Sequence, residues 1–162
     1  MHELAQAVVT NTTPLIALTA ATGSLEALRF LYSRVVVPYE VAQEIRVGGR
    51  DTFGVDVFES ASWLEIGSAP VALAPYLQNA LDRGEASVIQ TALDLGLQRV
   101  CIDEALGRRI ARLSNLSVTG SIGVLVKAKS LGYVVSIPEA LERMRERGIW
   151  LSQDVVRFAL AQ

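Results

Sequence analysis

Short apolar segments alternate along the chain with stretches in which apolar residues recur at every third or fourth position. The short segments have the length and the β-branched content of strands, and the longer ones have helical periodicity. Strands are predicted at residues 7–10, 35–37, 63–66, 99–102 and 116–118. Because strands and helices alternate, we expect an α/β fold with a parallel sheet.

Helix boundaries follow from capping residues. Pro14 suits the first turn of a helix with Thr13 as its cap, and Gly23 suits its end. Further helices are predicted at 24–32, 38–47, 82–95, 104–114, 121–131 and 136–148, with a short one after Asp51 and a last one capped by Ser152. No repeat or linker divides the chain, so residues 1–162 are expected to form a single domain.

The composition is apolar, with 51% hydrophobic residues and a mean hydropathy of +0.34. A parallel sheet buried on both faces accounts for this content. No apolar run reaches the roughly 18 residues that span a bilayer, and the first residues lack the features of a signal peptide. One cysteine, Cys101 in a predicted strand, permits no disulfide within the chain. A cytoplasmic protein with no membrane partner is expected.

The net charge of −2 provides no general attraction to nucleic acid. Contact with RNA would therefore need a local patch, for which Arg108, Arg109 and Arg112 on one predicted helix are candidates. The alternative is that they are ordinary exposed charges. The arginines between 143 and 147 alternate with glutamates, which favours a solvated helix face. Trp150, Phe158 and the apolar residues between them fit an intramolecular core or a dimer interface, and for most of them the core is expected.

Acidic residues fall where solvated carboxylates are not expected. Glu44 and Glu85 lie beside apolar stripes of predicted helices, Asp103 follows a strand, and Asn11 closes the first strand. Carboxylates that converge need a cation between them. The pattern therefore points to a hard divalent metal and to phosphate chemistry.

Each of these residues also has a structural explanation. Asp82 and Glu85 have the spacing of a capping box. Glu44 also suits the edge of the apolar stripe on an ordinary helix. Glu40, on the same helix, is expected to be the exposed glutamate. Asp103 suits a helix N-cap. The metal interpretation of Asp103 rests on geometry, because ligands of open parallel sheets gather at the carboxyl ends of strands, where Asn11 is also expected.

The donor types narrow the choice of metal. The chain has one histidine, His2, and one cysteine, too few for a zinc site. Oxygen donors suit Mg²⁺ or Mn²⁺. The sequence has no glycine-rich phosphate loop, which disfavours a Rossmann-like small-molecule binder, and no Ser-His or Cys-His pair for nucleophilic catalysis.

At several segments the chain resembles the PIN-like domain family, specifically short prokaryotic members. The matching segments are 8–16, 36–44, Gly84-Glu85-Ala86, Ile102-Asp103-Glu104, Gly107-Arg108-Arg109, 118–120 and 123–125. The similarity covers nearly the whole chain. It implies an α/β/α fold and a Mg²⁺- or Mn²⁺-dependent ribonuclease site.

Carried over position by position, the family site maps to Asn11, Glu44, Glu85 and Asp103, with Glu104 as an auxiliary. The chain departs from the family at Asn11, where an Asp is usual. Asn keeps one carbonyl oxygen for a metal but loses the negative charge. The resemblance also implies a possible toxin role, an antitoxin partner and a homodimer. The alternative function is a catalytically impaired module that binds RNA or protein.

Overall fold

The computed structural model describes residues 5–48 and 53–162 and contains one five-stranded sheet. Its strands are β1 (Ala5–Thr10), β2 (Tyr32–Val37), β3 (Glu65–Ile66), β4 (Arg99–Cys101) and β5 (Ser117–Thr119). All pair in parallel, in the order β3-β2-β1-β4-β5. The predicted strands are therefore confirmed as a parallel sheet. His2, Gly49 and Asp51 lie outside the described residues.

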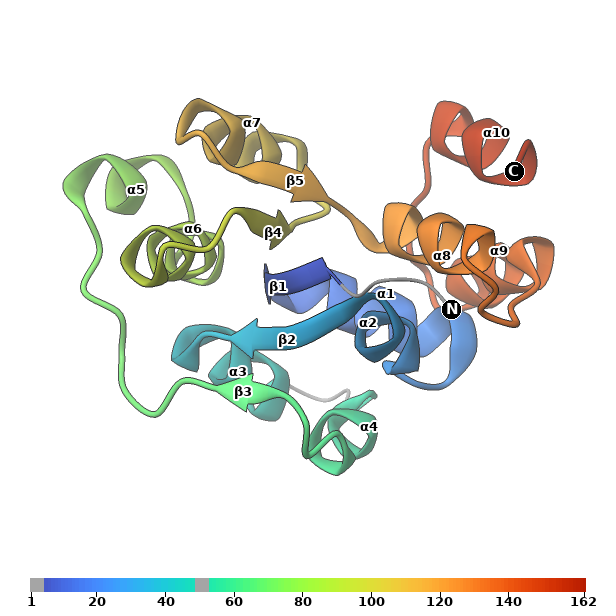
Figure 1. Ribbon diagram of the computed structural model, residues 1–162, viewed down its shortest axis with the longest axis horizontal. Helices are drawn as coiled ribbons and strands as arrows, with labels where there is room; N and C mark the ends of the chain where they lie inside the picture. Colours follow the sequence, from blue (N-terminus) through green and yellow to red (C-terminus); the bar gives the residue numbers. More distant parts are fainter. Residues whose placement is uncertain (1–4, 49–52) are drawn as a thin grey trace.

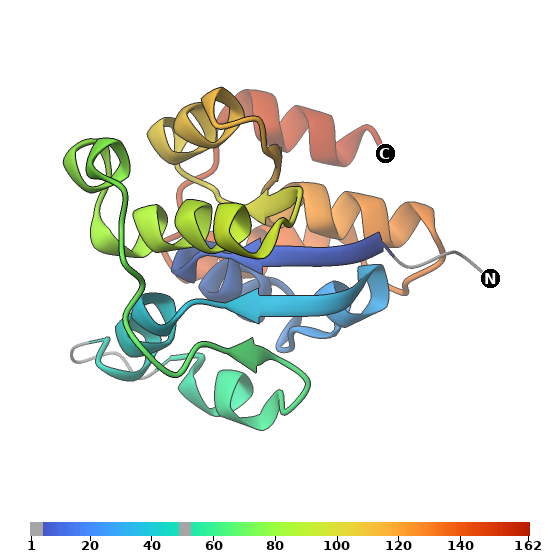
Figure 2. The same cartoon turned by 60° about the vertical axis from the view of Figure 1, so that its left-hand side comes forward.

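Helices cover both faces of the sheet and complete an α/β/α sandwich, as predicted (Figures 1 and 2). Helix α6 packs on β1 and β4 and also contacts α3, α5 and α7, while α1, α8 and α9 pack together on the other side. The helices are α1 (Thr12–Thr22), α2 (Glu26–Leu31), α3 (Tyr39–Arg46), α4 (Val55–Ser60), α5 (Pro75–Ala80), α6 (Arg83–Leu95), α7 (Ala105–Leu113), α8 (Ser121–Ser130), α9 (Ile137–Glu146) and α10 (Gln153–Leu160).

Most helix boundaries agree with the sequence. Asp82 and Ser152 accept hydrogen bonds at the starts of α6 and α10, and Gly23 ends α1 with a φ of 76°. Thr13 as the cap of α1 is wrong, because the helix already begins at Thr12 and Asn11 occupies the cap position. Tyr32, predicted to end a helix, opens β2. The six-residue helix α5 was not predicted, because it is too short for a periodic signal.

The strand order places a topological switch point at the centre of the sheet. From β1 the chain continues outward to β2 and β3 on one side, and later returns to place β4 on the other side of β1. Thr10 pairs with Cys101, and the backbone N–H of Asn11 donates to the Cys101 carbonyl at 3.0 Å. The carboxyl ends of β1 and β4 are thus neighbours, and ligands of open α/β sheets bind at such points.

The core lies on both faces of the sheet, with Val8, Val9 and Cys101 fully buried. The prediction that most apolar residues of the C-terminal segment join the core is wrong for Trp150, Val155 and Phe158, which are exposed, whereas Leu151 and Val156 pack against the core. Trp150 is 83% exposed and Phe158 is 52% exposed. The physical reason is that α10 contacts α8 and α9 at the rim of the fold (Figure 1), so it buries only one face. None of the helices in the described part of the chain is long and apolar enough to cross a bilayer.

Candidate active site

Asn11 and Glu104 meet at the carboxyl edge of the sheet. Asn11 follows β1 and is 4% exposed, and its Nδ2 donates to Glu104 Oε2 at 3.4 Å. The other oxygen of Glu104 accepts a 2.5 Å hydrogen bond from the Thr13 hydroxyl. The first turn of α1 therefore holds the Glu104 carboxylate in place beside the switch point.

Glu85 is a buried carboxyl in the first turn of α6. Its backbone N–H donates to Asp82 Oδ1 at 2.8 Å, so the cap expected from the sequence is formed. Its side chain nevertheless lies on the buried stripe, 9% exposed, and Oε2 has no hydrogen-bond partner within the described structure. A buried polar atom without a partner costs free energy, and a cation bound beside Glu85 Oε2 would offset that cost.

The electrostatics of Glu85 reflect its neighbours. Burial, together with the nearby carboxylates of Asp82, Glu104 and Glu44, raises the pKa of Glu85 to about 8. Burial is the largest cause, and a side-chain hydrogen bond with Asp82 is the next. The three carboxylates add to the rise because like charges disfavour ionisation. Carboxylates from the starts of α6 and α7 and from the last turn of α3 thus act on the Glu85 carboxyl, and a cation near it would relieve both costs.

Two glycines allow this close packing. A Cβ added at Gly107 would overlap Glu85 Oε2 and come within 2.9 Å of Ile102 Cγ2, while one at Gly84 would lie 2.8 Å from Glu44 Oε1. The glycines let α6 and α7 approach the carboxylates. The sequence gives no sign of this role, since it depends on contacts between helices.

Replacing Gly107 with Ala should therefore destabilise the protein by about 1–3 kcal/mol, the usual cost of overpacking. The free energy of unfolding in urea measures this. Gly96→Ala is not a matched control, because Gly96 has a φ of 68°. Ala111→Gly, at another buried small position of α7, tests whether any change on this helix is equally costly. A Gly107→Ala variant as stable as the wild type would contradict the packing described here.

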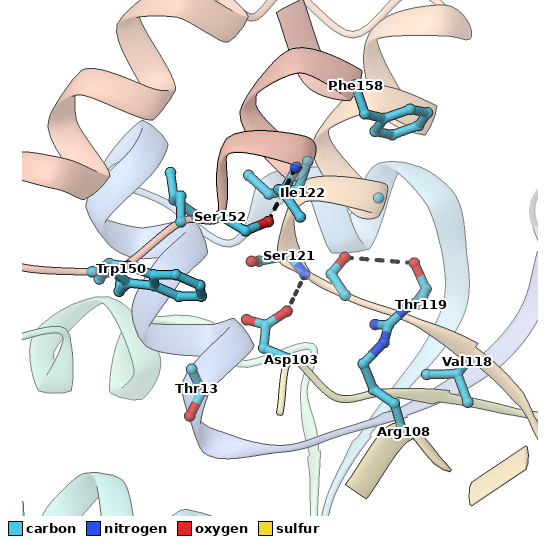
Figure 3. Close-up of a pocket in the computed structure, with 15 residues that line it drawn as sticks. Thr13, Asp103, Arg108, Val118, Thr119, Ser121, Ile122, Trp150, Ser152 and Phe158 are labelled. Carbon is cyan, nitrogen blue, oxygen red and sulfur yellow. Dashed lines mark hydrogen bonds between the residues drawn. The ribbon is translucent and has the colours of Figure 1, made fainter. Parts of the chain in front are cut away.

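Asp103 follows β4 but does not cap its own helix, contrary to the N-cap interpretation. Glu104 occupies the cap position of α7. The Oδ1 atom of Asp103 instead accepts a 2.8 Å hydrogen bond from the backbone N–H of Ser121, at the start of α8 (Figure 3). Burial raises the pKa of Asp103, Glu104 raises it further, and the Ser121 hydrogen bonds and Arg108 oppose the rise. Asp103 is thereby fixed between β4 and α8.

Glu44 and Glu40 have exchanged the roles expected of them. Glu40 is buried, 7% exposed, and its Oε2 accepts a hydrogen bond from Val71 N–H at 2.8 Å. The chain between β3 and α5 crosses this side of α3 and covers Glu40. Glu44 is exposed and accepts a 2.5 Å hydrogen bond from the Thr12 hydroxyl. Its exposure leaves the Glu44 carboxylate accessible to a ligand from solvent.

The acidic residues form a cluster but not a closed cage. Across residues 5–48 and 53–162, no three His, Cys, Asp or Glu side chains are arranged to hold one metal ion. The donor chemistry nevertheless fits a hard divalent cation, because the site presents carboxylate and amide oxygens and includes the unpartnered Glu85 Oε2.

Arg108 and Arg109 differ in position. Arg108 is half-buried and donates from Nη1 to the Ile102 carbonyl at 2.8 Å. It lines a cavity of about 470 Å³ together with Asp103. Arg109 is exposed on α7. Only Arg108 is therefore positioned beside the carboxylates.

Sequence reasoning missed Thr12 and Thr13 as the hydroxyl donors to Glu44 and Glu104. Their place directly after the first strand was a usable signal, because residues there face the same edge as Asn11. It also missed that Trp150 and Phe158 line the cavity beside Asp103. No signal in the sequence connects residues so distant along the chain.

The chain was compared with known protein families. The model of the family DUF3368, described as a PIN domain, matches residues 7–162. A search of curated proteins found no match.

Proposed function

This chain belongs to the DUF3368 family of PIN domains, a nuclease-type fold, and from that premise we propose that it hydrolyses RNA phosphodiester bonds with Mg²⁺ or Mn²⁺. One observation carries the proposal. A buried carboxyl oxygen without a partner, Glu85 Oε2, lies among other carboxylates at the topological switch point of a parallel sheet.

Glu44, Glu85 and Asp103 would hold the metal, with Asn11 and Glu104 completing or orienting its surroundings. When bound, such an ion neutralises charge that develops on a phosphoryl oxygen and lowers the pKa of a bound water.

The protein's own groups prepare that site. The Thr12 and Thr13 hydroxyls orient Glu44 and Glu104, and the Ser121 N–H orients Asp103. Arg108 retains N–H donors beyond the one it gives to Ile102, because a guanidinium has five, and these are available to an RNA phosphate. Positioning of this kind reduces the reorganisation needed in the transition state.

The test is RNA cleavage by the purified protein with Mg²⁺, with Mn²⁺ and with chelator. Cleavage that requires the metal is the expected result. Absence of cleavage by folded protein under all three conditions would reject hydrolysis of the RNAs used.

Asn11→Asp should tighten the binding of Mn²⁺ about tenfold or more, because a unit charge near a cation contributes more than 1.4 kcal/mol unless it is fully screened. Isothermal titration calorimetry of both proteins measures the change. Asn115→Asp, on the exposed turn after α7, is a control for added negative charge. Equal Mn²⁺ affinities of the wild type and Asn11→Asp would place residue 11 outside the metal site.

Asn11 also favours a second candidate, a catalytically impaired PIN domain that binds RNA or protein. The buried amide lacks the charge of the usual Asp. Binding of RNA without cleavage, even with Mn²⁺, would support this candidate over the nuclease.

We further propose that the protein is the toxin of a toxin–antitoxin pair and acts as a homodimer. Expression of the wild-type chain should then arrest bacterial growth, and a protein encoded by the neighbouring reading frame should relieve the arrest. Arrest by an Asp103→Asn variant as well would contradict a toxin that acts through this site.

A further inference from the structure

A cavity of about 470 Å³ lies between the start of α8, strand β5 and the C-terminal segment 149–158 (Figure 3). Its volume is within the range of small-ligand pockets. Asp103 and Arg108 lie on one side of it, and Trp150 and Phe158 contribute aromatic rings from the C-terminal segment. The cavity thus combines charged groups of the candidate active site with a separate aromatic wall.

Trp150 is held near this cavity although its side chain is 83% exposed. The N–H of Ile149 donates to the Met144 carbonyl at 3.1 Å, and Ser152 caps α10 by accepting from Val155 N–H at 3.1 Å. The backbone on both sides of Trp150 is therefore fixed. An exposed aromatic ring beside a cavity that also holds an arginine offers a face on which a flat ligand can stack.

The polar groups in the cavity indicate what would bind. Arg108 has further N–H donors for a phosphate, and the Thr13 hydroxyl, which donates to Glu104, can still accept a hydrogen bond. An apolar peptide would cover these groups without pairing them, which is costly. A nucleotide has a flat base to stack on an aromatic ring and a phosphate for an arginine.

We propose that this cavity binds one base of the RNA, stacked on the ring of Trp150. The inference rests on the proposed ribonuclease function. Because Asp103 belongs to both the cavity and the carboxylate cluster, a nucleotide held here lies next to the reacting groups. A base in a duplex cannot stack on Trp150 without leaving its own stack.

The first experiment measures binding of a labelled single-stranded RNA oligonucleotide by fluorescence anisotropy in Ca²⁺. Trp150→Ala should weaken binding about 5- to 150-fold, the usual range for loss of one stacking platform. Trp150→Phe should retain most of the affinity. Tyr76→Ala is the matched control, because Tyr76 is a 50% exposed aromatic outside the cavity, and it should bind like the wild type.

A second experiment uses the fluorescence of Trp150 itself. The chain has two tryptophans, so Trp63→Phe leaves Trp150 as the single reporter. Single-stranded RNA should quench it, and a hairpin that pairs the same bases should not. Equal quenching by both RNAs, or unchanged affinity of Trp150→Ala, would overturn the inference. A change in Trp150 fluorescence with protein concentration alone, without RNA, would assign the cavity to a second copy of the chain. That result would also overturn the inference.

Cleavage assays separate this inference from the proposed function. If the wild type cleaves RNA and Trp150→Ala has the same KM, the inference fails and the nuclease proposal stands. If Trp150 governs RNA binding but no metal supports cleavage, the inference stands and hydrolysis is rejected. If the wild type neither binds nor cleaves RNA, both fail. Melting temperatures show that each variant is folded.

Discussion

Asp103→Asn should lower the rate of metal-dependent RNA cleavage about 100-fold or more while leaving the melting temperature close to that of the wild type. Asn retains an Oδ1 acceptor for the Ser121 N–H, so the link to α8 is kept. It loses the negative charge that a divalent cation requires. Loss of a few kcal/mol of charge stabilisation in the transition state corresponds to this factor.

Single-turnover cleavage rates with Mn²⁺, measured beside melting temperatures, test this prediction. Asp94→Asn is the matched control, because Asp94 is an exposed Asp that accepts a hydrogen bond from Gln90 at 2.9 Å, which Asn also accepts. We expect the Asp94 variant to cleave like the wild type. If Asp103→Asn also cleaved at the wild-type rate, the metal site would have to be assigned without Asp103.

The metal-free protein should lose stability as the pH rises from about 4.5 to about 8. Glu85 binds its proton more tightly in the folded state, where its pKa is about 8, than in the unfolded chain, where it is 4.5. Within this window the unfolded chain has released the proton and the folded protein retains it, so the free energy of unfolding falls as the pH rises. Asp103, whose pKa is also raised, acts in the same direction.

We expect the free energy of unfolding to fall by about 2 kcal/mol across this pH window. This fall lowers the melting temperature by about 4–8 °C for a chain of this length. Thermal unfolding at pH 5 and pH 8.5 in chelator measures it. Glu85→Gln carries no titrating group and should remove most of the fall. Mn²⁺ should stabilise the wild type more at the higher pH, because the metal competes with the proton.

The matched control for this variant is Glu59→Gln. Glu59 is exposed and pairs with Arg46, which holds the pKa of Glu59 below its usual range. Glu59 therefore does not titrate within this window. The same pH-dependent fall in Glu85→Gln as in the wild type would show that another group causes it. A greater effect of Mn²⁺ at pH 5 than at pH 8.5 would contradict metal binding to the ionised Glu85.

The local sequence pattern was sufficient to predict much of the fold of this protein. The alternation of strands and helices predicted the parallel sheet, because apolar periodicity differs between the two kinds of element. The same pattern placed Glu85 on a buried stripe and put Asn11 and Asp103 at strand ends. Since parallel strands present their carboxyl ends at one edge, the approximate position of the candidate site followed from the sequence.

Contacts between segments that are far apart in the sequence decided which site residues are buried and what they bind. Glu40 is buried instead of Glu44 because the chain near Val71 crosses α3. Asp103 binds the start of α8 because β4 and β5 are neighbours in the sheet. Helical periodicity reports only which face of an element is apolar, and not which other segment covers that face.

The same limit applies to Gly107 and Trp150. Gly107 matters because Glu85, on another helix, fills the space that a side chain would need. Trp150 is as hydrophobic as a core residue, yet it is exposed because it lies in the connection between α9 and α10, outside the packed helices. The sequence by itself determined the elements and the edge where polar groups gather. The tertiary structure alone decided which of those groups are buried, paired or left open to a ligand, because these properties depend on packing between residues far apart in the chain.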